Sequence, residues 1–297
     1  MGKKSKMKGE YISLLKKQDH IGESKHLAKL NMREQNARYE PVKGIYSTST
    51  FNTYMKCCKL YSEFLREKHP EVRSFSEGKN YISEFINTKS ELSAWTQATY
   101  ASGLCSAYNI QKSEIDYKFP ERKRENITRS RECRSYRDSD PKYEDAKIFC
   151  KSTGARRCGI VRVTKSDIRE KEDHSLEVFL KEKNGMSGWR MVLPEFQKDI
   201  KRIFEEAPGY RTSNGELRLF RKNALPTELH SCRAEYVCSL YTYYATEGNY
   251  TSGDLYYCRG DMCGTVFDKG ILKKISLDVF HHRLDVVVTN YLYNYKK

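Results

Sequence analysis

The pattern of apolar and polar positions predicts a cluster of amphipathic helices in residues 47–108. In the first of these helices, apolar side chains recur every three or four positions on one stripe: Phe51, Tyr54, Met55, Cys58, Tyr61, Phe64 and Leu65. Serine and threonine residues precede the stripe and are suited to cap its first turn. The stretches FSEGKNYISEFI and SELSAWTQATYASGLCSAY repeat the pattern. Three or four such helices would pack into a small all-helical domain.

Residues 143–297 have a mixed pattern. Strand-like runs at residues 174–181 and 189–193 flank a turn that contains NGMSG, and Pro194 ends the second run, so the sequence predicts a β-hairpin. Helical patterns occupy residues 143–151, 195–204, 229–245 and 271–280. The valines at residues 286–288 form a short β-like run. The predicted fold class is therefore mainly α with a small antiparallel β-hairpin or sheet, in two domains.

Two polar segments separate these regions. Residues 1–43 are rich in lysine and poor in apolar runs, which predicts a basic N-terminal arm that is weakly helical at best. Residues 119–142 are dense in arginine and almost without aliphatic side chains, which predicts a linker. The expected organisation is thus an arm (1–43), a helical domain (44–118), an arginine-rich linker (119–142) and a second, larger domain (143–297).

The charge of the chain indicates a polyanionic partner. The 297 residues carry a formal net charge of +15, which favours nucleic acid first and an anionic membrane surface second. In the linker, the sign bias and the choice of arginine favour contact with DNA phosphates, and the candidate residues are Arg122, Lys123, Arg124, Arg129 and Arg131. No apolar run has the length of a membrane helix, and the start MGKKSKMKGEY lacks the apolar core of a signal peptide. We therefore expect a cytoplasmic protein.

The ten cysteines are expected to be reduced and to pack as small apolar side chains, because no secretion signal accompanies them. Cys258 and Cys263 form a CxxxxC pair, but no second pair of ligands stands at zinc-like spacing. The sequence therefore predicts neither disulfides nor a metal site.

Four short motifs place charged residues at unusual positions. In STGARRC, a glycine ends one predicted helix and Arg156 opens the next, where the helix dipole disfavours a cation. Lys183 lies in the turn of the predicted hairpin. His230 and Arg233 lie one turn apart on one side of a predicted helix. The fourth motif is FHHRLDVVVTNYL, near the end of the chain.

In their order, TGARR, a lysine in a hairpin turn, HSCRAEY and HHRLDVVVTNYL resemble the tyrosine recombinases of phages and conjugative elements, from about Gly44 onward. The resemblance implies that residues 44–118 bind the DNA core site and that residues 143–297 are catalytic. It implies these active-site residues: Arg156, Lys183, His230, Arg233, His281 and Tyr291. Lys181 is the alternative lysine and His282 the alternative late histidine. His281 is favoured because Arg283 and Asp285 fit the register of a GHNRxDV-like signature.

The resemblance implies site-specific recombination of double-stranded DNA, as in integration or excision of a mobile element, without metal or cofactor. The two arginines would neutralise the charge that grows on a phosphorane, and the histidines would donate hydrogen bonds or relieve Tyr291 of its proton. Tyr291 would attack to leave a 3′-phosphotyrosyl bond, while Lys183 protonates the leaving 5′ oxygen. The implied assembly is a homotetramer on synapsed DNA, with accessory proteins that bend DNA or set the direction of recombination.

Three positions depart from the family pattern. Gly159 stands where an acidic residue usually follows the first arginine and supports the site from behind. Phe280 replaces a common glycine, and Ala234 replaces a frequent histidine. Two alternatives stay open. One is an enzyme resembling a type IB topoisomerase or a resolvase of hairpin ends, which would share all of these motifs. The other, motivated by Gly159 and Phe280, is a non-catalytic DNA-binding protein with the same fold.

Overall fold

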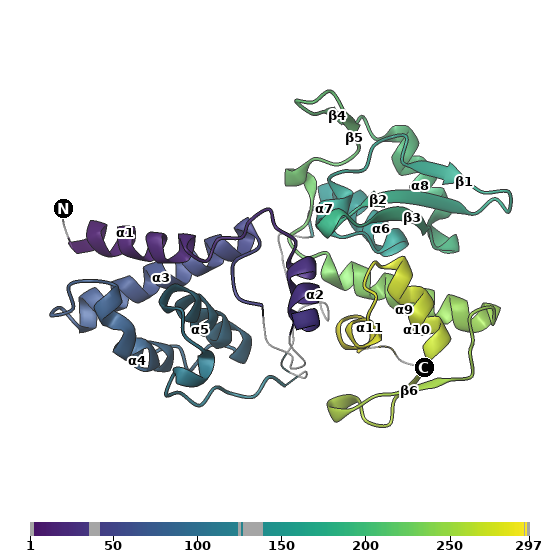
Figure 1. Ribbon diagram of the computed structural model, residues 1–297. Helices are drawn as coiled ribbons and strands as arrows, with labels where there is room; N and C mark the ends of the chain where they lie inside the picture. The colour runs from purple at the N-terminus through teal and green to yellow at the C-terminus, as the bar shows by residue number, and fades with distance from the viewer. Residues whose placement is uncertain (1–2, 36–41, 124–125, 127–138, 294, 296–297) are drawn as a thin grey trace. The chain divides into compact units, whose positions relative to one another are not determined.

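The computed structural model describes residues 3–35, 42–123, 126, 139–293 and 295 (Figure 1). Contacts divide the chain into two units, Met1–Arg122 and Lys123–Lys297. The first unit is helical, and the second combines helices with small antiparallel sheets. The predicted fold class, mainly α with a small antiparallel sheet, is confirmed.

The first unit contains five α-helices among its described residues: α1 (Lys3–Lys16), α2 (Lys25–Gln35), α3 (Thr48–Lys68), α4 (Ile82–Asn87) and α5 (Ala94–Tyr108). The predicted cap of α3 is present, because Ser47 Oγ accepts a hydrogen bond of 3.1 Å from the backbone N–H of Thr50. The core lies between α1, α3, α4 and α5. Tyr61 is fully buried there, edge-on to Phe75 and Phe85.

The N-terminal segment differs from the predicted arm. Helix α1 packs along α3, and its side chains Met7, Tyr11 and Leu15 are buried in the core of the first unit. These three residues are spaced by four, so they form one narrow stripe on a helix whose other faces are rich in lysine. The expectation of a weakly helical arm was wrong for this segment, because the low mean hydropathy hid a stripe of only three side chains.

The second unit contains these helices: α6 (Glu144–Thr153), α7 (Arg157–Ile160), α8 (Gln197–Glu206), α9 (His230–Glu247), α10 (Lys269–Asp278) and α11 (Leu284–Asn290). Its strands are β1 (Ile168–Glu170), β2 (Leu176–Lys181), β3 (Ser187–Met191), β4 (Tyr210–Arg211), β5 (Leu217–Arg218), β6 (Leu255–Tyr257) and β7 (Val266–Asp268). The strands pair in antiparallel fashion as β1-β2-β3, β4-β5 and β6-β7. The predicted hairpin is confirmed as β2-β3.

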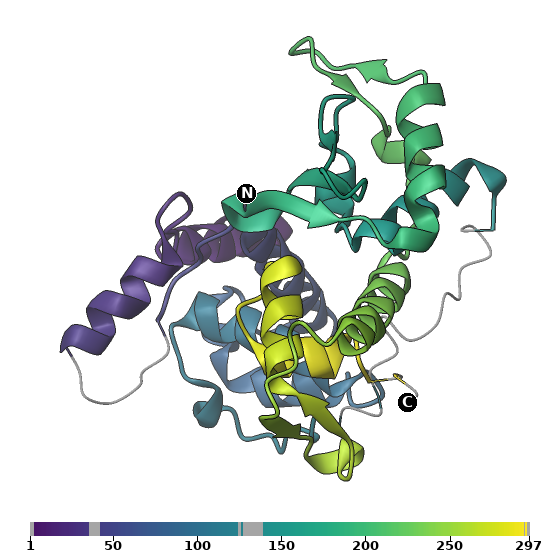
Figure 2. The same cartoon turned by 90° about the vertical axis from the view of Figure 1, so that its right-hand side faces the viewer.

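Two apolar clusters fill this unit. One lies between the three-stranded sheet, α6 and α8, and the other lies between α9, α10 and α11. Helix α9 packs against both α6 and α10, and α10 lies beside it in both views (Figure 1 and Figure 2). Helix α9 therefore joins the sheet half of the unit to the half that contains the C-terminal residues.

The valine run near the C-terminus is helical and not β-like. In α11, Val287 and Val288 are buried and Leu284 packs against the same apolar cluster, and Tyr291 continues this spacing just after the helix. This i, i+3, i+4, i+7 pattern is helical, and burial of the stripe against α10 outweighs the weak helix propensity of valine. The stripe also orients Tyr291, which lies on the buried side of the segment.

Candidate active site

The first arginine of the site is held where α6 gives way to α7. Gly154 caps the C-terminus of α6 with a left-handed φ of 59°, which favours glycine. A Cβ on this residue would also clash with the ring of Tyr236. Arg156 follows in extended conformation and precedes the first turn of α7. Its Nη2 lies 3.1 Å from His281 Nε2, and its Nη1 forms an ion pair with Glu182.

The second arginine, Arg233, lies on α9 and is 1% exposed. Its Nε donates to Tyr291 Oη at 3.0 Å, and its Nη2 donates to the backbone oxygen of Val279 at 2.7 Å. Its Nη1 donates to the backbone oxygen of Gly154 and lies 3.3 Å from Glu182 Oε1. With every nitrogen engaged, the guanidinium is fixed in one orientation.

Tyr291 and His281 meet between the two arginines. Tyr291 is buried, and its Oη lies 2.9 Å from His281 Nε2. Burial, together with the charges of Arg233 and Arg156, lowers the pKa of His281 to about 4. The imidazole is therefore neutral at pH 7, and in the tautomer that leaves Nε2 unprotonated it can accept the phenolic proton of Tyr291. His282, the alternative histidine, is exposed.

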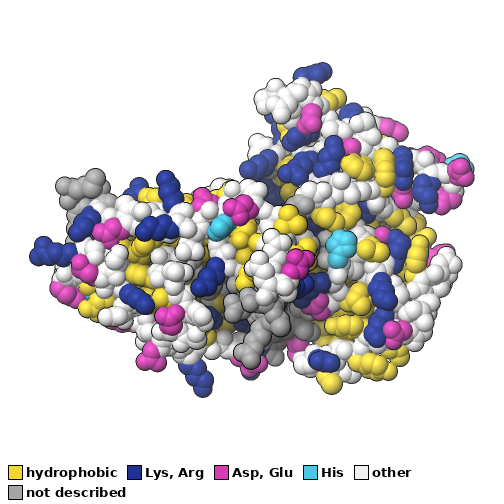
Figure 3. Space-filling model, in the orientation of Figure 1, with side chains coloured by type: hydrophobic (Ala, Val, Ile, Leu, Met, Phe, Trp, Pro, Cys, Tyr) yellow, Lys and Arg dark blue, Asp and Glu magenta, His cyan; other side chains and the backbone are white. Residues whose placement is uncertain are grey.

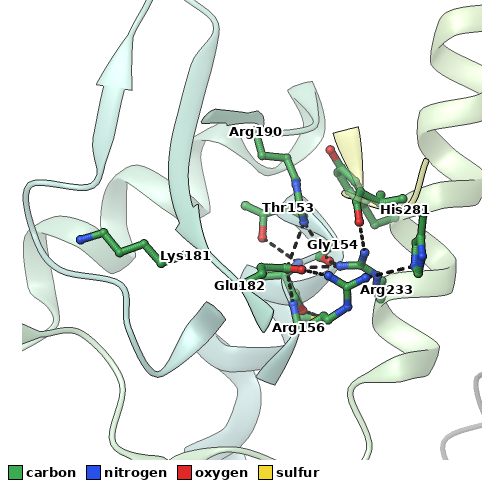
Figure 4. Close-up of polar contacts among 12 residues, drawn as sticks. Thr153, Gly154, Arg156, Lys181, Glu182, Arg190, Arg233 and His281 are labelled. Carbon is green, nitrogen blue, oxygen red and sulfur yellow. Dashed lines mark hydrogen bonds and ion pairs between the residues drawn. The ribbon is translucent and has the colours of Figure 1, made fainter. Parts of the chain in front are cut away.

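Two further charged residues of the site were missed in the sequence. The side chains of Glu182 and Arg190 are fully buried, and Arg190 Nη1 lies 3.4 Å from Glu182 Oε1 (Figure 4). Burial would raise the pKa of Glu182, but the charges of Arg190, Arg233 and Arg156 hold it below its ordinary value. The carboxylate is therefore ionised and shared by three guanidinium groups.

The strand pattern contained a signal for Glu182. In β2, Leu176, Val178 and Leu180 point inward, and alternation places residue 182 on the same face just after the strand. In β3, Arg190 is paired with Val178 and is buried. A charged residue in phase with buried aliphatic residues indicates a buried polar contact.

Neither candidate lysine joins this cluster. Lys181 and Lys183 are both exposed, and among the described residues no hydrogen bond or ion pair joins either side chain to Arg156, Arg233, His281 or Tyr291. Figure 4 shows Lys181 extending away from the cluster, and its Nζ lies 6.0 Å from the ring centroid of Phe179. Lys181 has the outward phase of β2, opposite to that of Glu182.

His230 shares a pocket with both arginines. The pocket has a volume of about 420 Å³, and its lining includes His230, Arg156 and Arg233. Lys222 and Arg157 also line it, and a neighbouring pocket adds Arg221. Figure 3 shows Lys and Arg side chains gathered over the part of the second unit where α7 lies. The chemistry of this lining suits an anion with several oxygens, such as a phosphodiester.

The structure therefore brings together Arg156, Arg233, His281 and Tyr291 by direct contacts. It places His230 on the pocket that Arg156 and Arg233 line. Of the linker candidates, Arg122 and Lys123 are exposed, whereas Arg124, Arg129 and Arg131 lie outside the described residues. Within the described ranges, no group of three His, Cys, Asp or Glu side chains could hold a metal ion. In the same ranges, no helix has the length and apolar character needed to span a membrane.

Neither a family model nor a curated protein sequence matches this chain. Solved structures do match. The XerH site-specific recombinase bound to its difH substrate, in a pre-cleavage complex, is similar over 97% of this chain and 92% of that chain, with a TM-score of 0.54 and 12% identity. Its post-cleavage complex with palindromic difH covers 96% and 91%, with a TM-score of 0.51 and 12% identity. The chain thus has the two-domain fold of a tyrosine recombinase.

Proposed function

We propose that this protein is a site-specific tyrosine recombinase that cleaves and rejoins DNA through Tyr291. The observation that carries the proposal is the environment of Tyr291 Oη, which lies 3.0 Å from Arg233 Nε and 2.9 Å from His281 Nε2. A neutral imidazole can take the phenolic proton, and a guanidinium stabilises the phenolate that forms. The fold shared with XerH, whose structures hold a recombination substrate, supports a DNA substrate.

In the proposed reaction, the scissile phosphate occupies the pocket lined by Arg156, His230 and Arg233. When Arg156 turns to the phosphate, His281 Nε2 is left to accept the proton of Tyr291. Tyr291 Oη forms a bond to phosphorus, the bond from phosphorus to the 5′ oxygen breaks, and the leaving oxygen takes a proton from Lys183. The products are a 3′-phosphotyrosyl bond and a free 5′-hydroxyl. Attack by the 5′-hydroxyl of a partner strand reverses the step and rejoins DNA.

Recombination exchanges strands between two duplexes, so the proposal includes a homotetramer on synapsed DNA. The exposed Arg122 and Lys123, with the arginines that follow them, would contact the phosphate backbone. We include integration or excision of a mobile element in the proposal, aided by accessory proteins that bend DNA or set direction. Mixing the protein with labelled duplexes and separating the complexes by mass would test the stoichiometry.

The test of the chemistry is covalent capture. The protein is incubated without metal or ATP with a library of nicked duplexes that includes the junctions of its own mobile element, and adducts that resist denaturant are mapped by peptide sequencing. We expect an adduct on Tyr291 that is abolished in Tyr291→Phe and kept in Tyr293→Phe and Tyr295→Phe. An adduct on another residue, or tight binding of the junctions without any adduct, would contradict the proposal.

A second candidate function is DNA binding without cleavage. The observation in its favour is that, among the described residues, no hydrogen bond or ion pair joins Lys181 or Lys183 to the Tyr291 cluster, so a general acid is not assembled in this structure. The capture experiment distinguishes the two functions, since this candidate predicts binding of the junctions and no adduct. If an adduct forms without exchange of strands between duplexes, the activity is that of a topoisomerase-like enzyme.

A further inference from the structure

Gly159 leaves a space beside the active-site arginines that another residue fills. Gly159 lies in α7, three residues after Arg156, and is buried. A Cβ on this residue would lie 3.3 Å from Glu182 Cγ and 3.6 Å from Glu182 Oε1. A side chain at position 159 and the side chain of Glu182 would therefore compete for one volume, which the carboxylate of Glu182 occupies here.

The carboxylate of Glu182 touches both arginines that contact Tyr291 or His281. Oε1 accepts from the backbone N–H of Arg156 at 2.8 Å and lies 3.3 Å from Arg233 Nη1. Oε2 forms the ion pair with Arg156 Nη1. Since Glu182 is fully buried, solvent screens these contacts much less than it screens ion pairs on the surface. One carboxylate thus links the arginine after α6 to the arginine on α9.

Arg190 completes this arrangement from the sheet. Its Nη1 lies 3.2 Å from the backbone oxygens of Thr153 and Gly154, and its guanidinium stacks on the ring of Phe280 at 4.5 Å. It brings a third positive charge to Glu182, so the cluster of one carboxylate and three guanidiniums keeps a net positive charge for an anionic substrate. Phe280, which departs from the family pattern, covers this buried charge.

We infer that Glu182 is the positioning residue of the active site. Its carboxylate holds Arg156 and Arg233, and it occupies the volume that a carboxylate on residue 159 would otherwise fill. The inference rests on the proposed function. Without the carboxylate, the buried guanidiniums of Arg190 and Arg233 and the partly buried guanidinium of Arg156 would repel one another, and Arg233 Nε would lose its fixed direction toward Tyr291 Oη. Glu182 reaches the reacting atoms only through the arginines.

The experiment is a double-mutant cycle on positions 159 and 182, read by single-turnover adduct formation on the duplex that the wild-type protein captures. We expect Glu182→Ala to slow adduct formation by about a hundredfold, because the arginines are misplaced. Gly159→Asp alone also slows it, because its side chain crowds Glu182. In the Glu182→Ala background, Gly159→Asp places a carboxylate in the vacated volume and restores at least about tenfold.

A matched variant separates positioning from packing. Glu182→Gln keeps the size of the side chain and removes its charge, and we expect slow adduct formation with nearly unchanged affinity for the same duplex. Adduct formation by Glu182→Gln at the wild-type rate would overturn the inference. A double variant no faster than Glu182→Ala would overturn it as well.

Failure of the proposed function gives a different result, because the wild-type protein itself would then form no adduct. The assignment of Glu182 is then decided by the thermal unfolding midpoints of the same proteins. We expect Glu182→Ala to lower the midpoint, since it leaves buried guanidiniums without their carboxylate, and Gly159→Asp to raise it again only in that background. A midpoint for the double variant at or below that of Glu182→Ala would overturn the inference without any reference to DNA.

Discussion

The two faces of the β2–β3 hairpin carry charge in opposite surroundings. Toward the interior, Glu182 and Arg190 are fully buried and belong to a network that reaches Tyr291 through Arg233. Toward solvent, Lys181 and Lys183 are exposed and are joined to no group of that network by a described hydrogen bond or ion pair. One short hairpin therefore supplies two kinds of residue. Glu182 and Arg190 are fixed in the folded chain, whereas no described contact with the network fixes Lys181 or Lys183.

The difference follows from the cost of burying charge. A buried carboxylate or guanidinium is tolerated only with partners, so the interior groups are fixed by each other as soon as the chain folds. An exposed lysine loses little by staying hydrated and gains little from one fixed geometry. We therefore expect the side chains of Glu182 and Arg190 to have fixed positions before DNA binds. The side chain of Lys183 should reach a fixed position only when it contacts DNA.

The largest effect is expected for Arg233, the most constrained member of the interior network. In Arg233→Lys the charge remains, but one ammonium cannot serve Tyr291, Val279 and Gly154 together. We expect single-turnover adduct formation to fall by about a thousandfold.

Arg190→Lys is the control, because Arg190 is equally buried but has no described contact with Tyr291 or His281. Both variants are compared at temperatures well below their unfolding midpoints. If Arg190→Lys lost as much cleavage activity as Arg233→Lys, the contact between Arg233 and Tyr291 would have no special role.

A smaller effect is expected for the outward lysines. If Lys183 protonates the leaving oxygen, Lys183→Ala slows cleavage by about a hundredfold on ordinary DNA. The defect disappears on a duplex in which sulfur replaces the bridging 5′ oxygen, because a thiolate leaves without a proton. The measurement is the single-turnover rate on the two duplexes.

Lys181→Ala is the matched control, since it lies two residues away and is equally outside the cluster. We expect it to cleave both duplexes at nearly the wild-type rate. If Lys181→Ala is defective and the sulfur-containing duplex restores its rate, Lys181 is the general acid. If the sulfur-containing duplex does not restore the rate of Lys183→Ala, the general acid is not Lys183.

The sequence indicated the residues around Tyr291 better than it indicated the buried charges behind them. Arg156, Arg233 and Tyr291 stood in short motifs of characteristic order, whereas Glu182 and Arg190 had only their phase in the strands to mark them. Long stripes such as that of α3 were readable because many residues repeat the helical period. The stripe of α1 has three members, and that of α11 is short and rich in valine, so tertiary packing decided both.

The smallest effect concerns the protonation of His281. The charges of Arg233, Arg156 and Arg190 act on its ring from α9, from the residue before α7 and from β3, with Glu182 as the opposing charge. Tyr291 Oη lies 2.9 Å from its Nε2. The pKa of about 4 in the folded protein lies below the ordinary value of 6.5, so the unfolded chain binds a proton in this window that the folded chain does not. Stability contributed by the neutral ring is therefore complete above pH 6.5 and is lost as the pH falls toward 4.

Thermal unfolding between pH 7 and pH 4 measures this contribution as a difference between variants. We expect His281→Gln to show a shallower loss of stability on acidification than the wild-type protein, because an amide takes up no proton. His282→Gln, which changes an exposed neighbour, should keep the wild-type slope. If the slopes of His281→Gln and the wild-type protein were equal, His281 would not be held neutral by the buried network, and its part in relieving Tyr291 of its proton would have to be assigned to another base.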